Sequence, residues 1–129
     1  MLPKDNRLAK VRDFNLLMKQ GRWVNGQFLD IKVLELGKAV DFLPKKIEVN
    51  NFIKQLRLAI TVGLKTSKSA VKRNQLKRQI REALGLLLKG SKIKRGYYLL
   101  VVARKEALDK NYAEISQEIE LLLKKGRLI

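Results

Sequence analysis

The chain has 129 residues, of which 29 are Lys or Arg and 12 are Asp or Glu, so its formal net charge is +17. It contains neither His nor Cys. This excludes a Ser-His-Asp triad, a histidine general base, a disulfide scaffold and a zinc site built on cysteine. The length fits one domain over residues 1–129 with a hydrophobic core, and the charge favours a polyanionic partner, nucleic acid above all.

The first half of the chain predicts an arm, a helix and two strands. Leu2–Lys10 shows no hydrophobic period, so we expect an extended arm. Val11–Gln20 has apolar residues three and four positions apart, which is typical of a helix. Partial alternation over Gln27–Leu36 and strict alternation over Leu56–Val62 predict strands. Gly37–Gln55 between them has mixed composition and is interpreted as a connection.

The second half predicts a long helix, a central strand and a last helix. Ser69 is a suitable N-cap for a helix over Ala70–Lys89. Tyr97–Ala103 is a continuous apolar run, which indicates a strand covered on both faces or central in its sheet. Asn111 and Glu114 form a capping pattern for a final helix. The order helix, strands, helix, strand, helix predicts an α+β fold, a two-layer sandwich.

The predicted helix over residues 70–89 has two faces of opposite character. At about 100° per residue its apolar side chains form one stripe, which we expect to pack on the core. The stripe consists of Leu76, Ile80, Ala83, Leu84 and Leu87. The other side carries Asn74, Lys77, Arg78 and Arg81, with Lys72 and Arg73 on the first turn. Residues 65–95 hold eleven basic residues and one acidic residue, a net charge of +10.

Three interpretations of this cationic face are open from the residues alone. Cations on successive turns suit contacts to nucleic-acid phosphates. A solvated face and a membrane-surface helix are the alternatives, but the apolar stripe has no Trp or Phe and is needed for the core. No stretch is long and apolar enough to span a membrane, and the first residues show no secretory pattern, so we expect a cytoplasmic protein. RNA and DNA are not distinguished at this point.

Four segments, in order, resemble the protein subunit of bacterial ribonuclease P. They are Leu2-Pro3-Lys4 with Arg7-Leu8 and Asp13-Phe14, then Arg57–Val62 (RLAITV), Ala70–Glu82 (AVKRNQLKRQIRE) and Tyr97–Arg104 (YYLLVVAR). The third motif is the specific one. The resemblance spans essentially the whole chain, although the connection over residues 37–55 has no clear counterpart in the family.

The resemblance implies a fold and a function. The fold is that of ribosomal-protein S5 domain 2, with a left-handed βαβ crossover. The function is that of an accessory subunit of an endoribonuclease, which helps a catalytic RNA subunit to remove the 5′ leader from precursor tRNA. Catalysis is then expected in the RNA, with Mg²⁺ bound mainly by the RNA, so the protein has no catalytic residue, no metal site, no small-molecule substrate and no membrane partner. The acidic residues of the last quarter mostly look like cap or solvent-side positions: Glu106, Asp109, Glu114, Glu118 and Glu120.

Matching the motifs residue by residue implies two sites. The expected RNA-binding residues are Arg57, Lys65, Lys68, Lys72, Arg73, Asn74, Lys77, Arg78 and Arg81. Phe14, Met18 and Ile31 are expected to line the cleft that holds the leader; Met and Ile stand where aromatic residues are common, so they stack on bases less well. Gln75 replaces a second arginine of the third motif. The alternative functions are a ribosomal or other structural RNA-binding protein of the same fold and a basic DNA-architectural protein.

Overall fold

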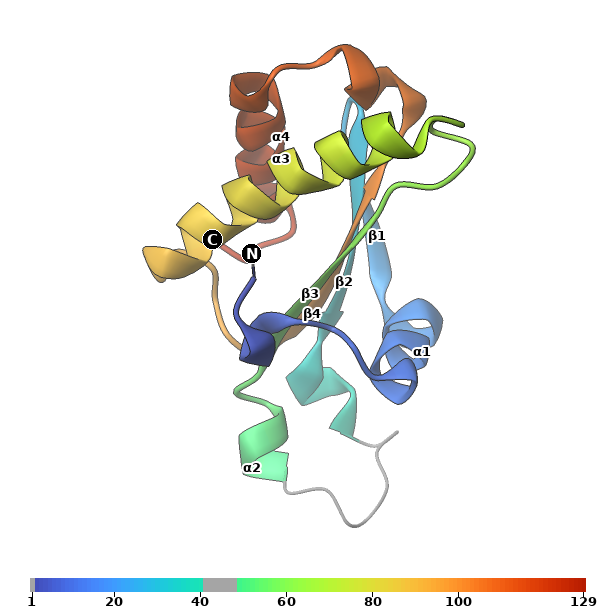
Figure 1. Cartoon of the computed structure of the whole chain (residues 1–129). Coiled ribbons are helices and arrows are strands. Elements are labelled where there is room, and N and C mark those ends of the chain that lie inside the picture. Colours follow the sequence, from blue (N-terminus) through green and yellow to red (C-terminus); the bar gives the residue numbers. More distant parts are fainter. Residues whose placement is uncertain (1, 41–48) are drawn as a thin grey trace.

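The structure is a computed structural model, and it describes residues 2–40 and 49–129. Its helices and strands follow one another along the chain as coloured in Figure 1. They are η1 (Lys4–Asn6), α1 (Val11–Gln20), β1 (Arg22–Asn25), β2 (Leu29–Glu35), η2 (Leu36–Lys38), α2 (Val49–Phe52), β3 (Leu56–Thr61), α3 (Ala70–Lys89), β4 (Tyr97–Ala103), η4 (Lys105–Asp109) and α4 (Tyr112–Lys125).

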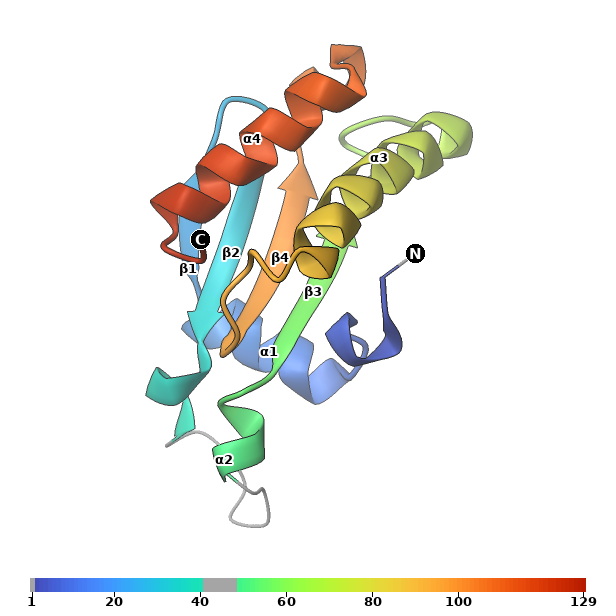
Figure 2. The same cartoon turned by 90° about the vertical axis from the view of Figure 1, so that its left-hand side faces the viewer.

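The strands form one four-stranded sheet in the order β1-β2-β4-β3. β2 is antiparallel to β1 and β4, and β3 is parallel to β4. The continuous apolar strand β4 is therefore central, as predicted. In Figure 2, α3 lies in front of the sheet, β3 and β4 both point upward, and β4 lies to the left of β3. The β3-α3-β4 crossover is thus left-handed, against the strong general preference and in agreement with the resemblance.

Hydrophobic side chains fill both sides of the sheet. The larger cluster lies between the sheet and the helices α3 and α4, and the smaller one includes Leu17 of α1. Figures 1 and 2 place α3 and α4 on one face and α1 at one end of the other. The predicted α+β layers are confirmed, and α1 adds a partial layer that leaves the rest of its own face uncovered by helix.

Both predicted helix caps are present. The Ser69 side chain accepts a hydrogen bond from the amide of Lys72 at 3.3 Å and begins α3. At the start of α4, Asn111 and Glu114 form the reciprocal capping box. These bonds satisfy amides that have no partner inside the helix, which explains why both helices begin where the sequence predicted.

Two parts of the chain differ from the prediction. The sequence showed no pattern for β1, because its four residues alternate too briefly to be distinguished from a loop. The N-terminal arm contains the short helix η1 and then follows the free edge of β3, where the amide of Leu8 donates to the carbonyl of Leu58 at 2.9 Å. The predicted connection over residues 37–55 contains the end of η2 and the helix α2. Residues 41–48 of this connection lie outside the described residues.

In the part of the chain that the structure describes, no helix is long and apolar enough to cross a membrane.

Candidate nucleic-acid interface

The amphipathic character of α3 is confirmed. Its five predicted core residues, from Leu76 to Leu87, are all buried and pack against the sheet. The polar face keeps Lys72, Asn74 and Arg78 exposed, while Arg73, Lys77 and Arg81 are half-buried. We call these six residues the α3 basic face. None of its cations takes part in an ion pair with a described carboxylate. The face therefore presents unneutralised cations to a partner.

The loop before α3 is anchored through two neighbouring residues, Thr66 and Ser67. The buried hydroxyl of Thr66 donates to the carbonyl of Ala103 at 2.8 Å, which ties the loop to the end of β4. The Arg73 guanidinium donates to the carbonyl of Ser67 at 2.8 Å. Lys65 and Lys68 remain exposed on this anchored loop. Their backbone thus stands in a fixed place beside the first turn of α3.

Arg57 lies apart from the other predicted RNA-binding residues. It follows the first residue of β3, whereas the loop with the two lysines comes after the end of that strand. Its guanidinium donates to the Arg7 carbonyl at 3.2 Å and to Oε1 of Gln55 at 3.3 Å, so it holds the N-terminal arm in place. Lys77 and Arg81, in contrast, line a cavity of about 330 Å³ together with Arg7 and apolar residues of β3.

The opposite face of the sheet carries two of the three predicted leader residues. Phe14 is half-buried against the smaller hydrophobic cluster, and Met18 follows one turn later on α1 with 38% of its surface exposed. Their spacing of four residues places them on the same side of the helix. Both side chains therefore lie on one side of α1, where Phe14 packs against the smaller hydrophobic cluster.

The prediction for Ile31 is wrong. Ile31 is 1% exposed and belongs to the cluster under α3 and α4, on the far side of the sheet from Phe14. The reason is the alternation of side chains along a strand, because only its neighbours Asp30 and Lys32 can face α1. Lys32 does so, and its ammonium group donates to the carbonyl of Met18 at 2.6 Å.

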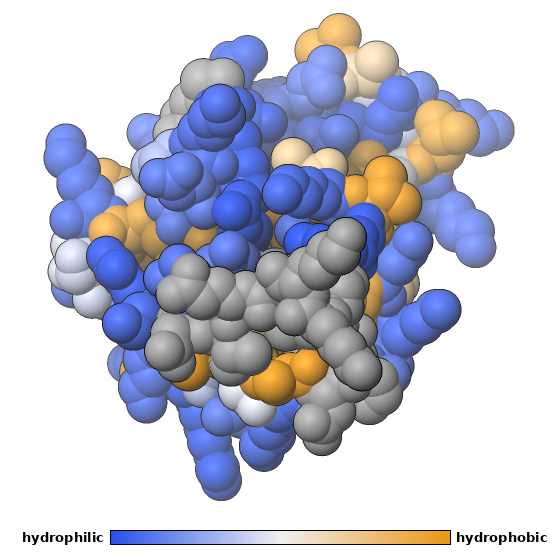
Figure 3. Space-filling model, turned by 90° about the horizontal axis from the view of Figure 1, so that it is seen from below, coloured by the Kyte–Doolittle hydropathy of each residue, from blue (hydrophilic) through white to orange (hydrophobic). Residues whose placement is uncertain are grey.

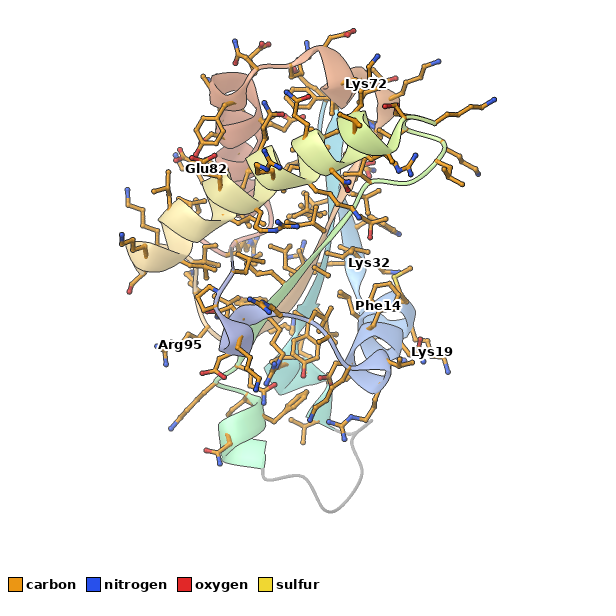
Figure 4. All side chains as sticks on the ribbon, in the orientation of Figure 1. Phe14, Lys19, Lys32, Lys72, Glu82 and Arg95 are labelled. Carbon is orange, nitrogen blue, oxygen red and sulfur yellow. The ribbon has the colours of Figure 1, made fainter. Side chains whose placement is uncertain are left out.

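Sequence reasoning missed Trp23 and Lys32 as members of this face. Trp23 pairs with Lys32, which in turn pairs with Leu100 of β4, so these side chains form a row across the sheet. The Lys32 ammonium lies 5.2 Å from the centre of the Trp23 ring, and 48% of the Trp23 surface is exposed. Recognition of β1 as a strand would have revealed the pair. Figure 4 labels Lys32 on the sheet and Phe14 on α1.

A buried tyrosine supports the same face from within the sheet. Tyr98 is 1% exposed, and its hydroxyl lies 3.0 Å from Oε1 of Gln55. Burial, followed by the nearby carboxylate of Asp13, raises the pKa of Tyr98 well above its ordinary value. The hydroxyl therefore stays protonated at neutral pH and can donate to Gln55. Asp13, on the first turn of α1, is itself buried and paired with Arg12 at 3.5 Å.

The acidic residues of the last quarter do not gather into one site. Among residues 2–40 and 49–129, no group of three or more Asp or Glu side chains could hold a metal ion. Glu114 serves the helix cap, as predicted. Glu118 departs from the expected solvent-side position, since it is 5% exposed and accepts hydrogen bonds from the amides of Phe28 and Leu29.

Comparisons with known proteins agree with this arrangement. A family model described as ribonuclease P matches residues 2–127. A ribonuclease P protein component from a Synechococcus species is 32% identical over 129 residues, which cover all of this chain and 87% of the relative. One from a Picosynechococcus species is 34% identical over 95% of this chain and 90% of its own. The structure of the Staphylococcus aureus RNase P protein superposes with a TM-score of 0.73 at 27% identity, covering 97% of this chain and 98% of that one.

Proposed function

Because this chain belongs to the family of ribonuclease P protein components, it is an accessory subunit of that endoribonuclease with the ribonuclease P RNA as its partner, and we propose that its two faces bind different RNA segments. The α3 basic face and its anchored loop bind the RNA subunit. The face with α1 binds the 5′ leader of precursor tRNA. The observation that carries this division is the sheet itself, which separates the two sets of side chains.

The chemistry of the α3 basic face suits a structured RNA backbone. Its cations stand on successive turns of a helix whose other side is locked into the core. Arginine offers planar, two-pronged donors for phosphate oxygens, and Asn74 adds a neutral donor and acceptor for sugar or base edges. Lys65, Lys68 and the free amides at the start of α3 extend this surface towards one end of the sheet.

The face with α1 suits a single-stranded segment. Bases without a pairing partner stack on aromatic rings and are held by nearby cations. Phe14, Met18 and Trp23 supply the apolar and aromatic surface, and Lys32, which is 8% exposed, supplies a positive charge at the Trp23 ring. Because Lys32 is fixed by the Met18 carbonyl and lies at the Trp23 ring, the two side chains form a stacking surface with a defined position.

Mg²⁺ enters this proposal as an ion held mainly by the RNA subunit. Among the described residues, no group of three or more Asp and Glu side chains could hold a metal ion. The role proposed for this chain requires no metal ion bound by the protein itself. What the chain contributes is positive charge and shape, which hold substrate and RNA subunit together.

The test is cleavage of a precursor tRNA by a bacterial ribonuclease P RNA, with and without this protein. We expect the protein to stimulate cleavage strongly at low Mg²⁺, where RNA alone is weak, and much less at high Mg²⁺. The protein without RNA is expected to leave the substrate intact. Cleavage by the protein alone, or an unchanged rate at every Mg²⁺ concentration, would contradict the proposed function.

A further inference from the structure

A basic groove lies at the end of the molecule where α3 finishes. It has a volume of about 620 Å³ and is formed by three segments that are far apart in sequence: η1, the entry to β3, and the last turn of α3 with the loop that follows it. Its lining residues are Asp5, Asn6, Lys54, Gln55, Leu56, Arg57, Leu88, Ser91, Ile93, Lys94 and Arg95. Of these, only Arg57 was expected from the sequence to contact RNA.

The rim of the groove is strongly positive. Lys54, Lys94 and Arg95 are exposed, Arg57 is half-buried, and Asp5 is the single acidic residue in the lining. No ion pair between described residues involves any of these five. Four cations that share one hollow with a single carboxylate repel one another, and an anion bound between them relieves that repulsion.

The floor of the groove is apolar. Leu56 and Ile93 are buried and Leu88 is half-buried, and all three belong to or pack on the larger hydrophobic cluster. A cationic rim over an apolar floor matches a nucleotide, whose phosphate is charged and whose ribose and base are largely uncharged. The volume lies within the range of about 300–1,000 Å³ that is usual for ligand sites.

The backbone beneath the cations is fixed. Lys94 donates its amide to the Leu128 carbonyl at 2.7 Å, and the amide of Gly96 donates to the Gln55 carbonyl at 2.6 Å. Gly96 has a φ of 96°, and a Cβ there would lie 2.8 Å from the Ile53 carbonyl oxygen, so glycine is required at this close approach. The loop thus holds Lys94 and Arg95 in place before any ligand binds, which reduces the entropic cost of binding.

The groove is separate from both faces already described. Leu88 follows Arg73 by fifteen residues on the same helix, so about 22 Å of helix axis separates the groove from the first turn of α3. Figure 4 shows this separation between the labelled residues Arg95 and Lys72. Seen from below, the described surface of the molecule is mostly hydrophilic (Figure 3).

We propose that this groove binds a phosphodiester segment of RNA, as a third contact that is independent of the α3 basic face and the face with α1. The inference rests on the proposed function, because it takes RNA as the partner. It adds a site at the opposite end of α3, so that the bound RNA must extend along the length of the helix or reach the protein with two separate segments.

The first experiment compares two double variants of equal charge. Lys94→Gln with Arg95→Gln removes two cations from the groove, whereas Lys89→Gln with Lys92→Gln removes two exposed cations close by that do not line it. The dissociation constant for the ribonuclease P RNA is measured over a series of salt concentrations, with a circular-dichroism melting curve as the folding control. We expect the groove variant to bind at least tenfold more weakly and to lower the salt slope by about two, and the control variant to change far less. Equal effects of the two variants, or none, would overturn the proposal.

The second experiment identifies the RNA segment. Because the chain contains no cysteine, Lys94→Cys and Arg78→Cys each create a single site for a tethered iron chelate, which cuts nearby RNA through hydroxyl radicals. The assay uses the full complex of protein, RNA subunit and precursor tRNA. Cuts from position 94 at nucleotides that position 78 does not reach support the groove and show whether the RNA subunit or the leader occupies it. Cuts from position 78 alone would overturn the proposed RNA contact in the groove but leave the proposed function intact. A groove that binds an acidic protein segment would give this result. The absence of cuts from both positions would contradict the groove proposal and the proposed function.

Discussion

Glu118 is a carboxylate buried among apolar side chains, and its two hydrogen bonds tie the loop between β1 and β2 to α4. Its Oε2 accepts from the amide of Phe28 at 2.7 Å and from the amide of Leu29 at 3.3 Å. The apolar neighbours of Glu118 on α4, such as Ile115 and Ile119, could be predicted from helical spacing. The role of Glu118 could not, because an acidic residue in a helix is normally exposed and its amide partners lie 90 residues earlier in the chain.

We predict that Glu118→Ala lowers the free energy of unfolding by about 1–3 kcal/mol for each amide left buried without a partner. Denaturant unfolding followed by circular dichroism measures the change. Glu120→Ala is the matched control, since it removes the same charge from an exposed position two residues away, and we expect a change within about 0.5 kcal/mol. Similar losses in the two variants would show that the charge, and not the two hydrogen bonds, is what matters.

Tyr98 gives a prediction about pH. Its pKa in the folded chain is raised above the ordinary value of 10.0, so the unfolded chain releases this proton first. The contribution to stability is therefore complete below about pH 10 and is lost as the pH rises from there towards the folded pKa. We expect the free energy of unfolding to fall less between pH 8 and pH 11 in Tyr98→Phe than in the parent. Lysine titration affects the parent and the variant alike. Parallel curves of unfolding free energy against pH would contradict a raised pKa for Tyr98.

At the scale of elements, the pairing of β1 with β2 decides which side chains lie on the face with α1, the face that we propose for the leader. Strand side chains alternate between the two faces of a sheet. A shift of one residue along β2 would therefore place Ile31, instead of Lys32, on the face with α1. The observed register places Lys32 opposite Trp23, and the pair stands beside Met18. An exposed tryptophan next to a fixed cation thus takes a place that the sequence alone assigned to isoleucine.

We predict that Trp23→Ala and Phe14→Ala each weaken binding of a precursor tRNA with a long leader. Binding of mature tRNA, which has no leader, and of the RNA subunit should change much less. Loss of one stacked base corresponds to about 1–3 kcal/mol, roughly five- to 150-fold in affinity. Trp23→Phe keeps a ring at the site and should restore most of the binding. If Trp23→Ala reduces affinity for tRNA with and without leader equally, the face with α1 does not hold the leader.

Arg78 tests whether the α3 basic face contacts phosphates of the RNA subunit. Arg78 is exposed, so Arg78→Gln should leave the melting temperature unchanged while it weakens binding to the RNA subunit. Replacing one phosphate contact should lower the slope of log K against log salt by about one. Lys89→Gln, at the far end of the same helix and outside the groove, is the control. A slope that stays the same in Arg78→Gln would argue against a phosphate contact at this residue.

At the scale of the whole molecule, the net charge of +17 acts on folding and on binding in opposite directions. Like charges on one small molecule repel one another, and RNA binding relieves this repulsion by neutralising them. The four ion pairs that the described residues form are few beside 29 basic residues. We therefore expect charge repulsion to destabilise the fold of the free protein, and RNA binding to relieve this repulsion.

We predict that the melting temperature of the free protein rises between about 10 mM and 500 mM NaCl, because salt screens the repulsion. Over the same range the affinity for the RNA subunit should fall. A variant with four cations of the α3 basic face replaced by Gln should show a flatter increase of the melting temperature. A melting temperature that falls with salt would mean that attractive ion pairs outweigh the repulsion.

The sequence by itself determined the helices α1, α3 and α4, the central strand and the α3 basic face, because each of these depends on periods of two or 3.6 residues within one segment. Its motifs also sufficed to indicate the family. The tertiary structure decided three further features: the side of the sheet on which Ile31 and Lys32 lie, the burial of Glu118, and the assembly of the basic groove from three distant segments. These features arise from strand register and from contacts between residues far apart in the chain. Local periodicity carries no information about such contacts, because the same pattern of residues is compatible with many pairings until the whole core is packed.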